Sequence, residues 1–270
     1  MPKVALVTGS SDSEGIGFAI AKALARTGCD VILTGSREDD KVTELVDEIR
    51  RDYKVKTTYI RADLRKEENI EYLCQECNRQ FPSGIDILVN NAGFGEVFPI
   101  ESYPVDRYND LIAVVLSAPF HLIRILLPDM KDKGWGRIVN ITSVGGVRPS
   151  IFMAPYCAAK HGLNGLTKAV AKETAEYGIT CNAILPGVVK TGLTRKGMEL
   201  LAEMEGISKE EMSKNFLHER HPTKEYVLPE DIADFTVFLC SQSAAQMTGT
   251  CVPMDGGHML NNCSSSSSKL

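Results

Sequence analysis

A doubly wound α/β fold around one parallel sheet is predicted by three features of this sequence. Short apolar runs rich in β-branched residues alternate with stretches in which apolar residues repeat at helical spacing. A glycine-rich turn directly follows the first of these runs. The chain has 270 residues, 43% of them hydrophobic, and no linker rich in Pro, Gly or Ser divides residues 1–260. We therefore expect a single domain over residues 1–260 with one sizeable core.

Seven apolar runs are the expected strands, because strands covered on both faces read as nearly continuous hydrophobic segments. They occupy residues 3–7, 30–34, 55–60, 85–89, 137–141, 179–184 and 250–254. In a sheet of this kind, ligands bind beyond the carboxyl ends of the strands. The residues found at such ends are Gly9, Asn90, Ser143 and Pro186.

The turn after the first run carries Gly9, Gly15 and Gly17 and leads into a helix that begins near Ile16. Glycines permit a tight turn and let backbone N–H groups approach a pyrophosphate at a helix N-terminus. A glycine triplet alone is weak evidence, but this one follows the first strand and opens a series of strand–helix units. It indicates a Rossmann-type dinucleotide site.

A second motif combines Tyr156 and Lys160 with Ser143, thirteen residues before the tyrosine. A phenol with a pKa near 10 is a poor acid or base at neutral pH. A lysine four residues further lies on the same helix face and can favour the phenolate. A serine at a neighbouring strand end can hold the oxygen that gains or loses the proton. Together they predict proton transfer to a carbonyl or from an alcohol.

Composition excludes several other classes of function. A net charge of −5 and a pI near 5.6 argue against nucleic acid or an anionic membrane as a partner, and we counted no apolar run long enough to span a bilayer. The eight cysteines are scattered and read as buried hydrophobes, and Cys74 with Cys77 forms a lone C-x-x-C. His218 and His221 read as solvated side chains. We expect no metal site.

These motifs, in their order and spacing, make the chain resemble the classical short-chain dehydrogenase/reductase family over residues 3–258. The matching residues are Thr8-Gly9 with Gly15-Ile16-Gly17, Asp63-Leu64, Asn90-Asn91-Ala92-Gly93, Ser143, Tyr156 with Lys160, Pro186-Gly187 with Thr191, and Asp255-Gly256-Gly257. The stretch from Leu185 to Gly257 looks most like bacterial-type 3-hydroxybutyrate dehydrogenases. The resemblance implies an NAD(P)-dependent oxidoreductase that transfers a hydride between nicotinamide and a secondary alcohol or carbonyl.

The family pattern assigns roles to residues of this chain. It makes Ser143, Tyr156 and Lys160 catalytic, with Lys160 also lowering the pKa of Tyr156. The cofactor residues that it implies are Gly9, Gly15, Ile16, Gly17, Arg37, Asp63, Leu64, Asn90, Ala92, Gly93, Tyr156, Lys160, Pro186, Gly187, Val188 and Thr191. Residues 192–228 correspond to the family's helical substrate lid. Homotetramers or homodimers, formed through long helices, are the implied assembly.

Three departures from the family matter. Five residues, Ser10–Glu14, separate the first two glycines, where members usually have three. Val115 stands where the family has an asparagine that holds a helix kink and a water. Gly95, Gly145 and Met153 stand where hydroxybutyrate enzymes carry polar groups for the carboxylate. A short hydroxy acid would lose these partners, so a larger or less polar substrate is expected.

Cofactor choice remains open between NAD and NADP. No acidic residue ends the second strand to bind a ribose 2′-hydroxyl, and Arg37 could meet a 2′-phosphate. Glu38, Asp39 and Asp40 follow at once and lean the prediction slightly to NAD. A dinucleotide-binding scaffold or sensor with little turnover is the alternative function, supported by Val115 and the altered glycine loop.

Residues 261–270 form a serine-rich tail that closes with Ser268-Lys269-Leu270. A C-terminal S-K-L is read by the peroxisomal import receptor, and a flexible serine tract would present it away from the folded body. The sequence therefore predicts a peroxisomal location, or a cytoplasmic one if the tail is not read.

Overall fold

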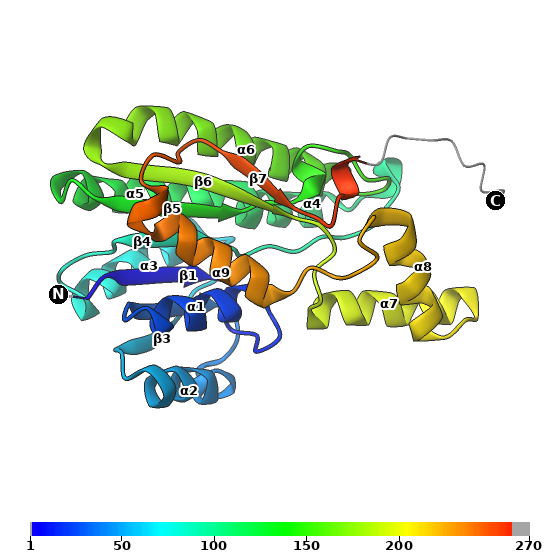
Figure 1. Cartoon of the computed structure of the whole chain (residues 1–270), viewed down its shortest axis with the longest axis horizontal. Coiled ribbons are helices and arrows are strands. Elements are labelled where there is room, and N and C mark those ends of the chain that lie inside the picture. The colour runs from blue at the N-terminus through cyan, green and yellow to red at the C-terminus, as the bar shows by residue number, and fades with distance from the viewer. Residues whose placement is uncertain (1, 261–270) are drawn as a thin grey trace.

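The structure is a computed structural model that describes residues 2–260 of the chain (Figure 1). Its centre is one sheet of seven parallel strands in the order β3-β2-β1-β4-β5-β6-β7. The strands are β1 (Val4–Thr8), β2 (Asp30–Gly35), β3 (Thr57–Arg61), β4 (Ile87–Asn90), β5 (Gly136–Ile141), β6 (Ile179–Pro186) and β7 (Cys251–Met254). The predicted doubly wound fold and its seven strands are confirmed.

Helices cover both faces of the sheet, as the alternation in the sequence predicts. They are α1 (Ile16–Arg26), α2 (Thr43–Tyr53), α3 (Glu67–Gln80), α4 (Val105–Ile112), α5 (Ala118–Asp132), α6 (Ala154–Thr174), α7 (Gly192–Glu205), α8 (Lys209–Arg220) and α9 (Pro229–Cys240). Parallel neighbours need a crossover of this kind because their ends lie at opposite edges of the sheet.

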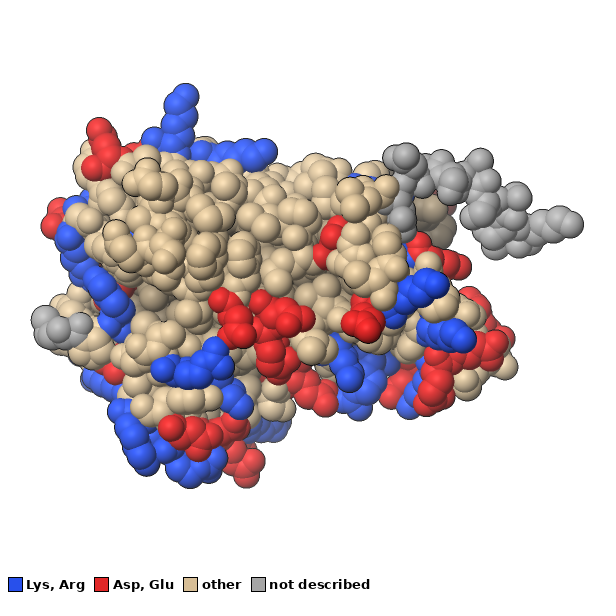
Figure 2. Space-filling view, viewed as in Figure 1, with Lys and Arg blue, Asp and Glu red and all other residues tan. Residues whose placement is uncertain are grey.

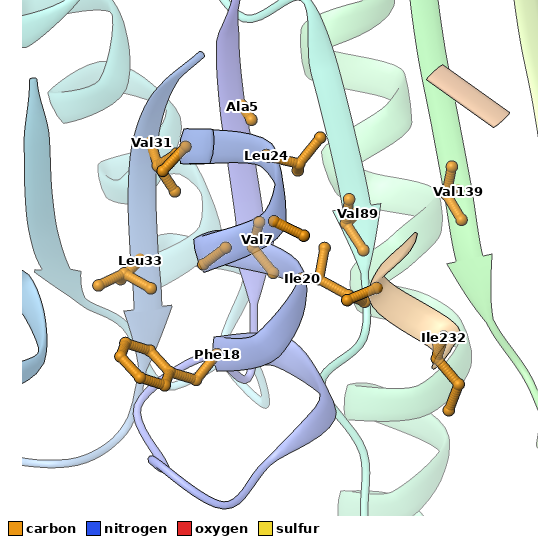
Figure 3. Close-up of a cluster of buried hydrophobic side chains, with 14 of the residues drawn as sticks. Ala5, Val7, Phe18, Ile20, Leu24, Val31, Leu33, Val89, Val139 and Ile232 are labelled. Carbon is orange, nitrogen blue, oxygen red and sulfur yellow. The ribbon is translucent and has the colours of Figure 1, made fainter. Parts of the chain in front are cut away.

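Successive residues of β1 point to opposite faces and supply two separate cores. Ala5 and Val7 pack with α1 and α9 on one face, where Ile20 and Ile232 are fully buried (Figure 3). Val4 and Leu6 face the other core, which α3, α5 and α6 cover. Both faces are therefore dry, and this explains why the strands read as uninterrupted apolar runs.

The strand order reverses at β1, which has β2 on one side and β4 on the other. Chains leaving β1 and β4 turn in opposite directions, so a crevice opens beyond their carboxyl ends. Thr8 ends β1 and Asn90 ends β4, and the glycine turn follows directly. The topology thus places the glycine turn at the position expected for a ligand.

A continuous helical run extends from Val105 to Asp132 through α4, a π-helical segment at Ala113–Ser117, and α5. By length and composition this run could cross a membrane. The expectation that no apolar run is long enough to span a bilayer was therefore wrong for residues 105–132. One such helix is weak evidence, since core helices pass the same test. This one packs on α3 and α6, and 39% of its most apolar window is buried.

The segment predicted as a lid contains α7 and α8, which lie together at one end of the molecule (Figure 1). Met198, Ala202 and Met212 form a small core between these two helices. His221 follows α8 and is fully buried, so the expectation of a solvated side chain was wrong for this residue. The tail with Ser268-Lys269-Leu270 lies outside the described residues.

Candidate active site

Three side chains meet at the carboxyl end of β5. Ser143 follows that strand, while Tyr156 and Lys160 lie one turn apart in α6. The Ser143 Oγ accepts a hydrogen bond from the Gly145 N–H at 3.0 Å, and the Lys160 Nζ lies 5.7 Å from the centroid of the Tyr156 ring. A Cβ on Gly145 would lie 3.2 Å from the Tyr156 Cε1 and 3.4 Å from the Ser143 Oγ. Glycine therefore keeps the serine and the phenol next to each other.

Burial controls the charge state of both ionisable groups. It raises the pKa of Tyr156, and the hydrogen bond with Ser143 opposes this shift. It lowers the pKa of Lys160 to about 8. The Lys160 Nζ donates to the Ile141 carbonyl oxygen at 2.8 Å. Burial is the largest influence on the phenol, so the structure does not bear out the expectation that Lys160 lowers the pKa of Tyr156.

Val115 lies beside this group, in the middle of the π-helical segment, and is fully buried. It packs in a small apolar cluster with Leu111 and Ala159, against which Tyr156 is placed. A Cβ on Gly93 would lie 3.6 Å from the Val115 Cγ2 and 3.7 Å from the Lys160 Nζ. The helix thus keeps a distortion at this position without the asparagine, and the lysine faces an apolar wall.

The glycine turn is shaped for close backbone approach. Gly9 has φ +64°, and a Cβ there would lie 2.8 Å from the Ala92 Cα. A Cβ on Gly17 would lie 2.4 Å from the Gly9 oxygen, so α1 can meet the turn only through glycine. Gly15 caps α1 without a side-chain hydrogen bond, and the first turn, starting at Ile16, has no acidic residue. These first N–H groups fit a pyrophosphate.

The side chains of Asn90 and Asn91, at the end of β4, have partners that differ from the predicted ones. The Asn90 side chain is buried and donates to the Asn140 Oδ1 at 2.8 Å, so it braces the sheet and does not line the cofactor crevice. Asn91 instead donates to the Thr8 and Gly9 carbonyl oxygens at 2.9 and 3.0 Å. The Thr8 Oγ1 accepts from the N–H groups of Asn91 and Ala92. Asn91 and Thr8 were missed, although both belong to the quoted motifs.

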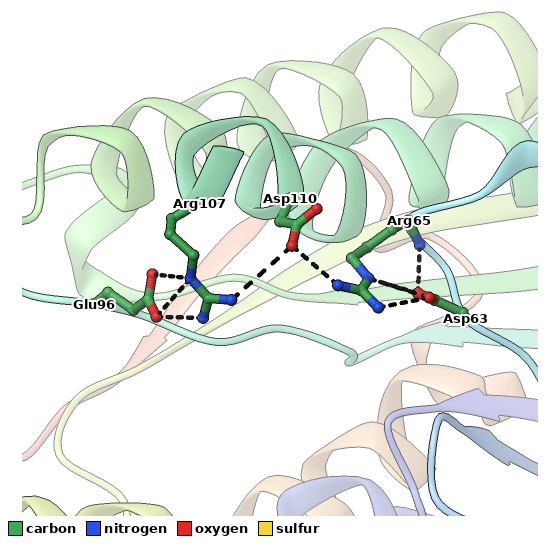
Figure 4. A network of polar contacts seen from close by, with 5 residues as sticks. All are labelled: Asp63, Arg65, Glu96, Arg107 and Asp110. Atoms are coloured by element: carbon green, nitrogen blue, oxygen red, sulfur yellow. Dashed lines mark hydrogen bonds and ion pairs between the residues drawn. The ribbon is translucent and has the colours of Figure 1, made fainter. Parts of the chain in front are cut away.

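A cavity of about 430 Å³ lies beyond β2 and β3, where the adenosine is expected. Asp63 lines it, but its carboxylate is held by Arg65 on both oxygens, and these bonds lower the pKa of Asp63. Arg65 also pairs with Asp110, as Figure 4 shows. The Leu64 side chain is buried in the core, so only its backbone could serve a ligand.

Arg37 does not point freely toward a ligand. Its Nη2 pairs with the Asp12 Oδ2 at 3.2 Å, and its Nη1 donates to the Ser11 carbonyl oxygen at 2.8 Å. The lengthened glycine loop therefore neutralises this arginine. On the far side of the loop, Glu14 pairs with Arg195 of α7 at 2.6 Å.

β6 ends at Pro186, and the segment that follows, starting at Gly187, forms the other side of the crevice. The Val188 carbonyl accepts from the Val227 N–H at 3.0 Å, and the Lys190 N–H donates to the Val227 carbonyl at 2.9 Å. In a parallel bridge the residue between these two, Val189, turns its own N–H and C=O away from the partner strand. Val189 therefore offers its backbone to a ligand better than the predicted Val188.

Thr191 closes this segment as the N-cap of α7, where its Oγ1 accepts from the Thr194 N–H at 3.2 Å. Together, the uncapped start of α1, the close-packed glycines and the Val189 backbone fit a dinucleotide. Within residues 2–260, no group of three His, Cys, Asp or Glu side chains is arranged to hold a metal ion. Cys74 and Cys77 are buried, and burial raises the pKa of both thiols.

Comparison with known proteins agrees with this geometry. A family model described as short chain dehydrogenase matches residues 3–200. The chain belongs to the short-chain dehydrogenase family. The D-beta-hydroxybutyrate dehydrogenases of Rhizobium meliloti (strain 1021) and Cupriavidus necator are each 42% identical to it, over 95% and 94% of this chain and 98% and 97% of theirs.

Solved structures of other short-chain dehydrogenases superpose on nearly the whole chain. L-sorbose reductase from Gluconobacter frateurii, complexed with NADPH and L-sorbose, is 30% identical with a TM-score of 0.91, covering 97% of this chain and 98% of that one. An actinorhodin polyketide ketoreductase variant with NADPH is 32% identical with a TM-score of 0.88, covering 95% and 97%. This short-chain dehydrogenase is therefore an oxidoreductase that acts on alcohols or carbonyls with a nicotinamide cofactor.

Proposed function

We propose that this short-chain dehydrogenase acts on an uncharged, largely apolar ketone or secondary alcohol, and not on 3-hydroxybutyrate. The observation that carries the proposal is the surroundings of Tyr156. A Cβ on Gly95 would lie 3.0 Å from the Met153 Cε and 3.4 Å from the Tyr156 Cδ2. A thioether and two glycines, Gly95 and Gly145, thus surround the phenol. A carboxylate buried there would lack a partner, and this costs several kcal/mol.

The bound nicotinamide supplies or accepts the hydride. Tyr156 donates the proton to the substrate oxygen during reduction and accepts it during oxidation. The Ser143 hydroxyl, which lies beside the phenol, polarises the same oxygen. Lys160 binds the cofactor and, once charged beside it, favours the phenolate. A pKa of about 8 leaves this lysine mostly protonated at neutral pH.

The site gives less support to the alternative of a scaffold with little turnover, because Ser143, Tyr156 and Lys160 stand together at the carboxyl end of β5. The Tyr156→Phe variant separates the two functions. It should bind NADH like the parent and lose turnover by about 10²–10⁴-fold, since only the proton-handling hydroxyl is removed. Equal turnover in parent and variant would remove Tyr156 from the mechanism. Binding by the parent without any single-turnover hydride transfer over a broad carbonyl panel would favour the scaffold.

The effect of substrate charge is tested by introducing a lysine at Met153, beside Tyr156. Parent and Met153→Lys are compared on acetoacetate and on an uncharged methyl ketone of similar length, with Met204→Lys on the exposed end of α7 as the matched control. A charge-assisted hydrogen bond of about 1.5–3 kcal/mol should raise the acetoacetate-to-ketone ratio of kcat/KM by about 10–100-fold in Met153→Lys alone. A parent that already prefers acetoacetate would contradict the proposed substrate class.

Two further properties belong to the proposal. NAD is the favoured cofactor, because Asp12 neutralises Arg37 and no other cation follows β2 before the acidic residues 38–40. A homodimer or homotetramer is the favoured assembly, built on the apolar helical run 105–132 and on α6. Import into peroxisomes through the tail 261–270 also remains a proposal from the sequence.

A further inference from the structure

His221 joins the lid to the cofactor loop through a buried imidazole. It is the first residue after α8 and is 0% exposed. Its ring packs against two glycines: a Cβ on Gly187 would lie 2.5 Å from the Nε2, and one on Gly256 would lie 3.0 Å from the Nδ1. One side chain therefore contacts the segment after β6, the turn after β7 and the end of the lid.

The hydrogen bonds of this ring fix its tautomer. The Val188 N–H donates to the Nε2 at 2.9 Å, and the Nδ1 lies 2.7 Å from the Glu225 carbonyl oxygen. A backbone N–H can only donate and a carbonyl can only accept. The Nε2 must therefore carry a lone pair and the Nδ1 a proton, which is the neutral imidazole.

Val188 is the neighbour of Val189, whose N–H and C=O turn away from Val227. The Val188 amide donates to His221 and its carbonyl accepts from Val227, so these two bonds fix the position of Val189. We propose that His221 is a positioning residue that holds the loop 187–191 for nicotinamide binding. The inference rests on cofactor binding by this loop and holds for any substrate.

Two substitutions at the same position test the proposal by calorimetric titration of the full chain with NADH, without any carbonyl substrate. In His221→Gln, the amide oxygen can reach the Val188 N–H, and we expect NADH affinity near that of the parent. In His221→Asn, the shorter amide can reach Glu225 but not Val188, and we expect NADH binding about tenfold weaker.

His218→Gln in α8 is the matched control, because His218 is exposed and its replacement should leave NADH affinity unchanged. Rescue by glutamine but not asparagine is a result that loss of packing alone does not produce. A His221→Gln variant that binds NADH as weakly as His221→Asn contradicts the proposal. So does an Asn variant that binds NADH like the parent. Because no substrate is present, an error in the proposed substrate class would not affect these outcomes.

Discussion

At the residue scale, the loss of water on burial is the main influence on the charge of Lys160, a candidate catalytic residue. Lys160 is 4% exposed, and its one hydrogen bond, to the Ile141 carbonyl, does not offset the loss of water around a charged ammonium. The usual asparagine would bring a polar group to the wall that Val115 fills with methyl groups. Burial thus brings the pKa of Lys160 to about 8, close to neutral pH.

The lowered pKa of Lys160 predicts that its contribution to the free energy of unfolding depends on pH. Folded Lys160 gives up its proton near pH 8, whereas a lysine in the unfolded chain keeps it to about 10.5. Between these values the unfolded state binds more protons, so Lys160 makes the free energy of unfolding rise with pH. At pH 7.5, Lys160→Met removes the cost of the buried charge. Its stability advantage over the parent should therefore shrink by about 3 kcal/mol between pH 7.5 and pH 10.5.

Urea unfolding of both proteins at the two pH values measures this difference. The buried cysteines titrate equally in parent and variant, so their contribution cancels in the comparison. Lys172→Met, on the exposed C-terminal turn of α6, is the control and should show no such pH dependence. A stability difference that stays constant across this range would mean that Lys160 keeps its charge in the folded chain.

At the element scale, the sequence predicted the strands to within one or two residues at most ends. The expected run 30–34 became Asp30–Gly35, and 85–89 became Ile87–Asn90. Strands covered on both faces leave a clear apolar signal, so their positions can be predicted without knowing which neighbours they pair with. The glycine turn and the pair Tyr156 and Lys160 were predictable for a similar reason, since local spacing alone places them.

Partners distant in sequence were not predictable in this way. Asn90 and Asn91 are adjacent amides, and only the tertiary structure shows that the first faces Asn140. His221 lies in a polar stretch, yet two glycines more than thirty residues away enclose it. From the sequence, Arg37 could have met a phosphate. The lengthened loop that carries its partner Asp12 departs from the family, so the ion pair between them could not be predicted.

We expect the lengthened glycine loop to influence the choice between NAD and NADP through the ion pair of Asp12 with Arg37. Asp12→Asn should release Arg37, which is half exposed, to meet a 2′-phosphate. We expect affinity for NADPH relative to NADH to rise by about tenfold, within the range of a charge-assisted hydrogen bond. Arg37→Ala should leave NADH affinity nearly unchanged, and in the double variant the gain for NADPH should vanish.

Titration of the parent and these three variants with NADH and with NADPH measures their relative affinity for the two cofactors. A parent that strongly prefers NADPH and loses this preference in Arg37→Ala would show that the Asp12 pair opens on binding. The lean to NAD would then be wrong, while the rest of the site would be unaffected.

At the scale of the whole molecule, charge and apolar surface are separated. Lys, Arg, Asp and Glu mix around α2 and around α7 and α8, whereas the face over β6, β7 and α6 carries few charges (Figure 2). The helical run 105–132 has a window with a mean hydropathy of 2.0, of which only 39% is buried. Val105, Tyr108 and Phe120 are exposed on this run. Large apolar side chains exposed along an apolar helix of a folded domain indicate an interface.

We therefore expect the full chain to sediment as a dimer or tetramer and Phe120→Glu to sediment as a monomer. Phe120 is 48% exposed in the single chain, and a glutamate buried there in an assembly would have to be desolvated without a partner. Met204→Glu, on a side chain 75% exposed at the end of α7, is the control and should keep the parent's assembly. Analytical ultracentrifugation measures the state, and NADH titration shows whether the variant is folded. If Phe120→Glu sediments like an oligomeric parent, or the parent is itself monomeric, the helical run 105–132 is not the interface.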